Sequence, residues 1–229
     1  MPPDSLRVLA AEVERCVLCP RLVAHREAMA REKRRAYRDW EYWGKPVPPF
    51  GDLKARLMIV GLAPAAHGGN RTGRMFTGDR SGDYLYRALY QTAFASQPHS
   101  VSRDDGMRLT DVYITSSVRC APPDNKPTPE EFSTCSAYLN REVALLKRVR
   151  VVVALGKLGF DAYLRVLKEH GVIAKQTGLL FGHDRVHDLG ENAPVLISSY
   201  HPSQQNTSTG RLTAEMLHAV FARARRMLR

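Results

Sequence analysis

Short apolar runs alternate with amphipathic stretches along the chain. Four of these runs have the character of buried strands: 56–62, 111–117, 151–155 and 194–200. The segments around them are predicted as helices: 4–16, 20–43, 82–96, 129–149, 156–170 and 213–229. The second of these is polar and rich in Arg, Lys and Glu. This alternation predicts an α/β fold, a three-layer sandwich with a mainly parallel four-stranded central sheet flanked by helices. Since there is no internal repeat and no long linker, we expect a single domain over 1–229.

Ligands of such sheets bind beyond the carboxyl ends of the strands. Four loops are therefore expected on one rim of the sheet: 61–81, 116–128, 156–158 and 200–211. The first loop lies in the stretch GLAPAAHGGNRTGRMFTGDRSG, in which six of 22 positions are glycine. Glycines after a strand let the backbone come close to a ligand, although a plain structural turn would need them too. The stretch matches neither a nucleotide phosphate loop nor a dinucleotide fingerprint, so nucleotide triphosphate binding is not expected.

Basic residues outnumber acidic ones, 34 to 23, and the formal net charge is +11. Such a field favours polyanions, and nucleic acid is the leading candidate partner. The arginines are scattered instead of lining one amphipathic helix, which argues against a membrane surface. The apolar runs are too short to cross a bilayer and the N-terminus lacks an export signal, so we expect a cytoplasmic protein.

Four cysteines offer a soft ligand set: Cys16 and Cys19 as C-x2-C before a proline, Cys120 after the second strand, and Cys135 in the following helix. Four thiolates suit either a zinc ion or a [4Fe-4S] cluster. Disulfides are disfavoured without an export signal, and unrelated buried cysteines remain an alternative because only the first pair has ligand spacing.

Several motifs together resemble one known family. They are C-x2-C near the N-terminus, GLAPAAHGG, MFTGDRSGDYL, YITSSVRCAPPDNKPTPEEF before the fourth cysteine, and SSYHPS near the C-terminus. In order and spacing they resemble the uracil-DNA glycosylase superfamily, and within it the iron-sulfur members of bacteria and archaea. The resemblance implies a [4Fe-4S] cluster on Cys16, Cys19, Cys120 and Cys135, and DNA as the partner of a protein expected to be a monomer.

Two departures bring the chain nearest to family 5, the type B enzymes. Ala63, Ala65 and Ala66 stand where most members carry a water-activating Asp, Asn or Glu, and Ser116 stands where family 4 has an Asn that reads the uracil edge. Both departures imply a less exacting pocket. Substrates would then include DNA with uracil, hypoxanthine, xanthine, hydroxymethyluracil or ethenocytosine.

Roles for site residues follow from this resemblance and from the chemistry of the N-glycosidic bond, which joins the base to its sugar. Cleavage builds negative charge on the departing base, where the N–H of His201 would donate, and positive charge on the sugar, where Asp79 would position water. Asn125 is expected to support them. The flipped base would meet a substrate-binding set made of Phe76, which stacks on it, Ser116, and the bare backbone at Gly61, Ala63 and Ala65. Competing interpretations are a helix cap for Asp79, core packing for Phe76 and an ordinary loop histidine at position 201.

Contacts to the DNA are expected from the basic and polar rim. This set comprises Arg71, Arg74, Arg80, Ser203, Gln204, Gln205 and Arg211. The stretch 204–212 is the candidate wedge that fills the gap left by the flipped base. We expect a monofunctional glycosylase, because the rim offers a Schiff-base mechanism no obvious lysine except Lys126 or Lys157. The alternatives are a non-catalytic iron-sulfur protein that binds damaged DNA and an electron-transfer protein.

Overall fold

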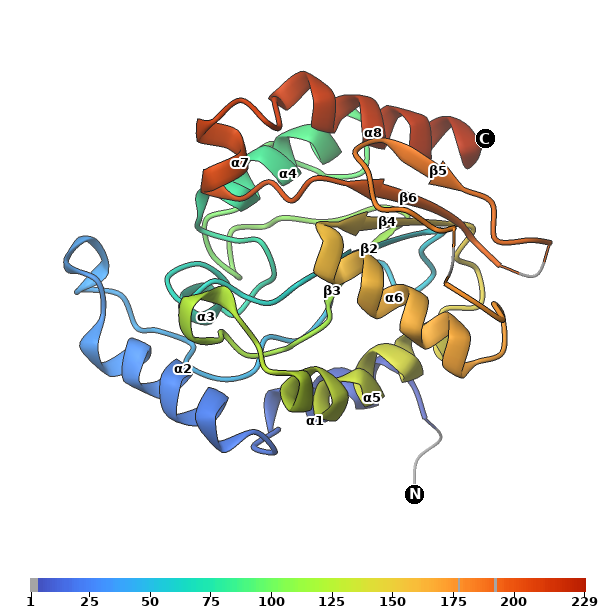
Figure 1. Cartoon of the computed structure of the whole chain (residues 1–229). Helices are drawn as coiled ribbons and strands as arrows, with labels where there is room; N and C mark the ends of the chain where they lie inside the picture. The colour runs from blue at the N-terminus through green and yellow to red at the C-terminus, as the bar shows by residue number, and fades with distance from the viewer. Residues whose placement is uncertain (1–3, 177, 192) are drawn as a thin grey trace.

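One mixed sheet organises the protein (Figure 1). Within residues 4–176, 178–191 and 193–229, which the computed structural model describes, six strands pair in the order β1-β3-β2-β4-β6-β5. The strands are β1 (Phe50–Gly51), β2 (Leu57–Gly61), β3 (Val112–Ser116), β4 (Val151–Leu155), β5 (Arg185–His187) and β6 (Val195–Ser199). The pairs β2–β3, β2–β4 and β4–β6 are parallel, whereas β1 and β5 are antiparallel to their neighbours.

The mainly parallel α/β sandwich is confirmed, but the predicted number of strands is too low. The four parallel strands lie where the apolar runs predict them. The two additional strands, β1 and β5, lie at the sheet edges and are two and three residues long. Because most of their residues are at least partly exposed, they lack the apolar run by which a buried strand is recognised.

Helices flank the sheet and interrupt its loops. The α-helices are α1 (Leu6–Glu14), α2 (Pro20–Glu32), α3 (Gly69–Thr72), α4 (Arg80–Gln91), α5 (Pro129–Leu145), α6 (Lys157–Glu169), α7 (Gln204–Ser208) and α8 (Ala214–Met227), with 3-10 turns η1 (Arg35–Tyr37) and η2 (Pro123–Asn125). The predicted helix 20–43 is too long, because the chain leaves α2 at Lys33, whose φ is 52°. Among the described helices, none combines the length and apolar composition that crossing a bilayer requires.

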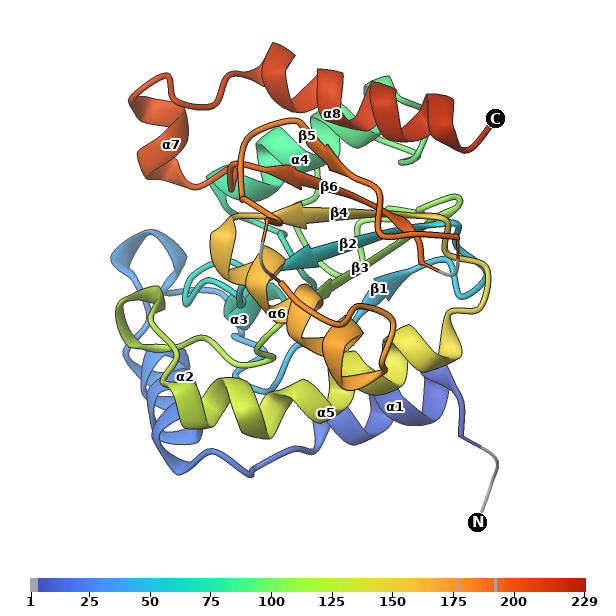
Figure 2. The same cartoon turned by 45° about the vertical axis from the view of Figure 1, so that its right-hand side comes forward.

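The sheet buries both of its faces. Along β2, Leu57 and Ile59 join a core with α4 and α8, while Met58 and Val60 join a second core with α5 and α6. Figures 1 and 2 show α4 and α8 over one face and α1, α5 and α6 over the other. Successive side chains of a strand point to opposite faces, so a strand buried on both sides must be apolar at every position. This explains why the apolar runs are continuous.

The loops after β2, β3, β4 and β6 all leave the sheet on the same side, at the carboxyl ends of the parallel strands. The registers of the three parallel pairs place Gly61 beside Ser116, and Leu155 beside Ser199. The prediction of one rim built from four loops is therefore confirmed.

Candidate active site

The glycine-rich loop after β2 ends at Asp79, which caps α4. The Asp79 carboxylate accepts a hydrogen bond of 3.0 Å from the backbone N–H of Gly82. Its other oxygen lies against Gly68, where an added Cβ atom would come within 1.9 Å of Oδ2. Burial raises the pKa of Asp79, and the N–H groups of Gly82 and Ser81 partly oppose this shift. The helix-capping interpretation is thus confirmed, and the same carboxylate is half-buried and held closely in place.

His201 follows β6, and its ring lies beside Phe76. The ring centroids are 5.7 Å apart, with the planes inclined by 32°. Burial lowers the pKa of His201 to about 4, so its imidazole is neutral near pH 7 and carries one N–H donor. The side chain of Asn206 donates to the backbone carbonyl of His201 over 2.8 Å and fixes this segment. A neutral, oriented N–H is suited to meet a developing anion.

A cavity of about 270 Å³ opens next to His201. Its walls are apolar and aromatic, with Leu62, Leu158, Phe181 and Tyr200, and cationic side chains stand at its margin. One of these, the guanidinium of Arg211, lies 4.6 Å from the ring centroid of Tyr200. Such a lining can accept a planar group next to an anionic one.

Phe76 belongs to the loop that carries Asp79 and packs beside His201, which lines the cavity. Its ring lies near Gly61, where an added Cβ would be 2.8 Å from Cζ, and near the ring of His201. Phe76 itself has a φ of 51°, an uncommon backbone conformation for a side chain of this size. Asp79 is not among the residues that line the cavity, so a direct pairing of Asp79 with His201 across it stays a prediction.

The other predicted base-binding residues differ in their placement. Gly61 and Ala65 lie in the loop as expected, and in the described chain the backbone N–H groups of Leu62, Ala63 and Ala65 donate no hydrogen bond. The side chain of Ala63, however, packs against the cysteine cluster.

Ser116 is not available to a base. Its hydroxyl is buried and donates to the carbonyl of Val118 over 2.8 Å. The prediction that this hydroxyl lines the substrate pocket is wrong, because the strand end turns it into the protein.

Arg71 does not contact phosphate, contrary to the prediction. It is 3% exposed, and its guanidinium lies between the rings of Tyr37 and Trp40, 3.9 and 4.1 Å from their centroids. Its Nε donates to the carbonyl of His67 and its Nη2 to that of Gly78, over 2.8 and 2.6 Å. Arg71 therefore acts inside the protein, where it holds the carbonyl of the residue before Asp79.

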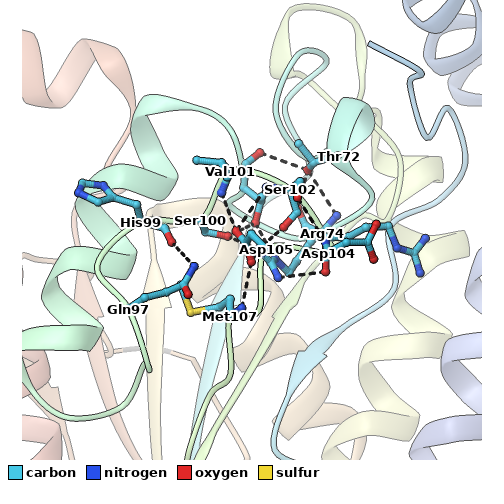
Figure 3. A network of polar contacts seen from close by, with 12 residues as sticks. Thr72, Arg74, Gln97, His99, Ser100, Val101, Ser102, Asp104, Asp105 and Met107 are labelled. Carbon is cyan, nitrogen blue, oxygen red and sulfur yellow. Dashed lines mark hydrogen bonds and ion pairs between the residues drawn. The ribbon is translucent and has the colours of Figure 1, made fainter.

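The prediction is also wrong for Arg74, which is 4% exposed (Figure 3). Its Nη2 donates to Asp105 Oδ1 over 2.6 Å and to Ser100 Oγ over 2.7 Å, while its Nε donates to Thr77 Oγ1 over 3.1 Å. The backbone N–H of Gly78 donates to the carbonyl of Ser100. These bonds tie the segment 97–107 to the loop that carries Asp79, so Arg74 holds the site in shape.

The remaining predicted DNA contacts lie at the surface. Arg80, Gln204, Gln205 and Arg211 are exposed, and Ser203 caps α7 by accepting from the N–H of Asn206. Their contact with DNA stays a prediction.

The predicted wedge 204–212 is not an open loop. It begins with the short helix α7, and Leu212 at its end is fully buried in the core. Leu212 cannot enter a duplex without unfolding this packing, so a wedge would have to come from the exposed residues of α7 and the turn after it.

Asn125 lies in the turn η2 on the rim, after β3. It is exposed and has a φ of 56°. Asn adopts this left-handed conformation more readily than most residues. Its proposed support of catalysis stays a prediction.

The four cysteines meet at one place. They line a single small cavity together with Arg26 and Arg119, and all four are free thiols. Arg26 Nη1 donates to Cys120 Sγ over 3.1 Å, and the backbone N–H of Arg119 donates to Cys135 Sγ over 3.3 Å. Burial raises the pKa of Cys120 to about 11 and that of Cys135 to about 12. These thiols would stay protonated at neutral pH unless a positively charged centre bound the sulfurs and displaced the protons.

Four sulfurs at one place are a soft donor set, which suits a zinc ion or a [4Fe-4S] cluster. One zinc ion would hold four sulfurs at about 2.3 Å, and hence about 3.8 Å from one another. Over the described ranges, no group of three or more Cys, His, Asp or Glu side chains is close enough together to hold a metal ion. The guanidinium of Arg26 faces Cys120, whereas that of Arg119 pairs with Glu142. A cation beside the sulfurs suits a centre with net negative charge.

Sequence reasoning missed these arginines and Gly68. Arg26 lies two helical turns beyond Cys19, and Arg119 directly precedes Cys120. A cation close to a candidate metal ligand in the sequence indicated such a role, but whether its side chain points at the sulfurs depends on the fold. The role of Gly68 is visible only once Asp79 is placed against it.

Comparison with known proteins shows the family to which the chain belongs. Residues 48–225 match the family model of the uracil DNA glycosylase superfamily. The matched range includes every strand of the described sheet and the loops that carry Asp79 and His201. The chain therefore belongs to the uracil-DNA glycosylase superfamily.

Its relatives narrow this class to one group. The type-5 uracil-DNA glycosylase of Mycobacterium leprae is 50% identical over 224 residues, which are 97% of this chain and 96% of that protein. That of Thermus thermophilus is 49% identical over 212 residues, 93% of either chain. That of Pyrobaculum aerophilum is 49% identical over 215 residues, 91% of this chain and 87% of that protein. Within the superfamily the chain groups with type 5.

Proposed function

We propose that this protein is a monofunctional DNA glycosylase that removes uracil and other deaminated bases by hydrolysis of the N-glycosidic bond. The observation that carries the proposal is the half-buried, neutral imidazole of His201, which packs beside Phe76 and lines the cavity. The type-5 relatives are named for action on uracil in DNA, which supports uracil as one substrate.

The substrate must leave the duplex before the bond is cut. A paired base cannot reach any residue of the rim, so the enzyme extrudes the nucleotide, and deaminated pairs cost least to open. The exposed ring of the base then stacks on Phe76. Its carbonyl oxygens accept from the free N–H groups of Leu62, Ala63 and Ala65, which bind the planar group without reading one particular base.

Hydrolysis then divides between two side chains. As the bond from C1′ to the base nitrogen breaks, its electron pair moves to the base, where His201 donates a hydrogen bond to the developing oxyanion. The Asp79 carboxylate positions water and stabilises the cationic sugar. Water adds its hydroxyl to C1′, and its proton passes to the released base. The raised pKa of Asp79 makes it a stronger base than an exposed aspartate, which suits this role.

A [4Fe-4S] cluster held by Cys16, Cys19, Cys120 and Cys135 is part of the proposal. Hydrolysis transfers no electrons, so when bound the cluster serves structure. Its ligands come from the turn between α1 and α2, the loop after β3 and helix α5, and Ala63 of the active-site loop packs against them. The arrangement supports a cluster that fixes the first rim loop.

The tolerance for several bases is the finer part of the proposal. The Ser116 hydroxyl at the end of β3 is buried, so it cannot take the place of the Asn side chain by which family 4 reads the uracil edge. Hypoxanthine, xanthine, hydroxymethyluracil and ethenocytosine are therefore expected substrates beside uracil.

Release of the free base from duplexes carrying each lesion tests the function. We expect free base and an intact abasic strand with uracil and with at least one deaminated purine, and no strand cleavage before alkali. Specific binding of these duplexes without any base release would instead favour the non-catalytic damage-binding protein.

A further inference from the structure

An exposed, positively charged segment spans the end of α2 and the residues after it. We call residues 31–38 the basic arm. It carries five cations, Arg31, Lys33, Arg34, Arg35 and Arg38, and one acid, Glu32. The four arginines are exposed, and in the described part of the chain none of them forms an ion pair. The ammonium of Lys33 instead donates to the carbonyl of Arg38 over 3.2 Å, which closes the arm on itself.

The arm is anchored to the active-site loop through Arg71. Tyr37 of the arm and Trp40 just after it hold the Arg71 guanidinium between their rings. The same guanidinium donates to the carbonyl of Gly78, the residue before Asp79. Cation–π contacts with a desolvated guanidinium are among the stronger contacts of this kind. Arg71 thus joins the arm to the carboxylate that we assign to catalysis.

A second set of contacts keeps the segment after the arm in place. The hydroxyl of Tyr42 lies 3.0 Å from His67 Nδ1, and the backbone N–H of Trp43 donates to the carbonyl of Arg71 over 2.9 Å. Gly73 lies beneath the ring of Trp43, where a Cβ would be 3.0 Å from Cδ2. The chain is therefore held in place directly after the arm, while the four arginine side chains of the arm extend into solvent.

The arm lies on the side of the molecule to which the four parallel strands point. In Figures 1 and 2 the segment between α2 and β1 projects beside α3, at the carboxyl ends of the strands. A nucleotide that enters the rim must bring the phosphates of its own strand to this side. Arginine binds phosphate through a planar pair of donors, and four unpaired guanidinium groups on one short segment can contact several phosphates in succession.

We propose that the basic arm is a DNA-binding element that contacts the backbone phosphates flanking the flipped nucleotide, with Arg71 as its internal anchor. The proposal rests on the proposed function, because it takes DNA as the ligand. It also replaces the predicted phosphate contacts of Arg71 and Arg74, which are buried, with cations that solvent reaches.

The dependence of DNA binding on salt tests the proposal. Each phosphate contact contributes about −0.9 to the slope of log K against log salt. The triple variant Arg34→Gln, Arg35→Gln, Arg38→Gln is expected to lower the magnitude of this slope by up to about 2.7 on an undamaged duplex. The loss of affinity between about 50 and about 200 mM salt would then be up to about 40-fold smaller than for the unsubstituted protein.

A matched control separates local contact from total charge. The variant Arg148→Gln, Arg165→Gln, Lys168→Gln removes three exposed cations near the opposite end of the strands and lowers the net charge of +11 by the same three units. It should keep the original slope. Equal slopes for the arm variant and the unsubstituted protein, or an equal change in both variants, would overturn the proposal.

Base release distinguishes this proposal from the proposed function. At enzyme concentrations below saturation, the arm variant should release uracil more slowly than the unsubstituted protein, because it binds the duplex less tightly. If the unsubstituted protein released no base at all, the proposed function would fail, while the slopes on undamaged DNA would still decide whether the arm binds phosphate.

Discussion

Replacement of Gly68 by alanine places a methyl group where the Asp79 carboxylate now lies. The added Cβ would be 1.9 Å from Asp79 Oδ2 and 2.8 Å from its Cγ. Ordinary van der Waals contact begins near 3.4 Å. The carboxylate must therefore move by about 1.5 Å, which is the difference between 3.4 and 1.9 Å. Since Asp79 also caps α4, it cannot turn away without losing the hydrogen bond from Gly82.

This displacement should slow catalysis far more than it weakens the fold. A misplacement of about 1 Å at a reacting centre can cost about 100-fold in rate, whereas loss of a helix cap costs about 1 kcal/mol. We expect Gly68→Ala to release uracil at least about 100-fold more slowly in single turnover, with nearly unchanged circular dichroism.

Two further proteins make this test specific. Gly182→Ala is the control, because the nearest atom to its Cβ would be Arg185 Cδ at 3.6 Å, and it should behave as the unsubstituted protein. In the double variant Gly68→Ala, Asp79→Ala the clash is gone, so its rate should equal that of Asp79→Ala alone. A normal rate in Gly68→Ala, or a double variant much slower than Asp79→Ala, would refute the assigned position of the carboxylate.

Three other outcomes are expected. Burial holds the pKa of His201 at about 4, so below pH 6.5 the unfolded chain binds a proton that the folded protein does not. The free energy of unfolding should fall by about 3 kcal/mol between pH 6.5 and 4 because of this group, and urea titrations should show a smaller fall for His201→Gln. Glu142→Ala should destabilise the protein by about 3 to 5 kcal/mol in urea unfolding, because it leaves the buried Arg119 without its ion-pair partner; Glu130→Ala, at an exposed position of the same helix, should not. Cys135→Ser should lower the iron content and visible absorbance of freshly purified protein, and a colourless, iron-free unsubstituted protein that contains zinc would contradict the cluster.

The sheet could be predicted because burial on both faces leaves a direct mark on the sequence. Every position of β2, β3 and β4 is buried, and a short continuous apolar run is typical of a strand covered on both sides. The edge strands β1 and β5 are held by pairing with a neighbour instead of by burial. The end of α2 was equally hidden, since charged residues continue unchanged past Lys33 while the backbone leaves the helix.

The site was predictable where chain position alone decides the neighbours. Asp79 and His201 follow strands whose ends share one edge, so their approach to the rim followed from topology. Arg71 and Arg74 lie on the same rim but are buried, because each finds partners from distant segments, while the Ser116 hydroxyl bonds to Val118 two residues further on. A sequence shows that an arginine is present, whereas the choice between phosphate and an internal aromatic pair or carboxylate depends on tertiary contacts.

The central claim is that Asp79 and His201 together cut the bond between a flipped uracil and its sugar. Single-turnover release of uracil by the unsubstituted protein, Asp79→Ala and His201→Ala, at enzyme concentrations that saturate the DNA, tests it most directly. We predict release by the unsubstituted protein and a loss of about 100-fold or more in each variant, with DNA binding retained. Release at the original rate by both variants would contradict the account.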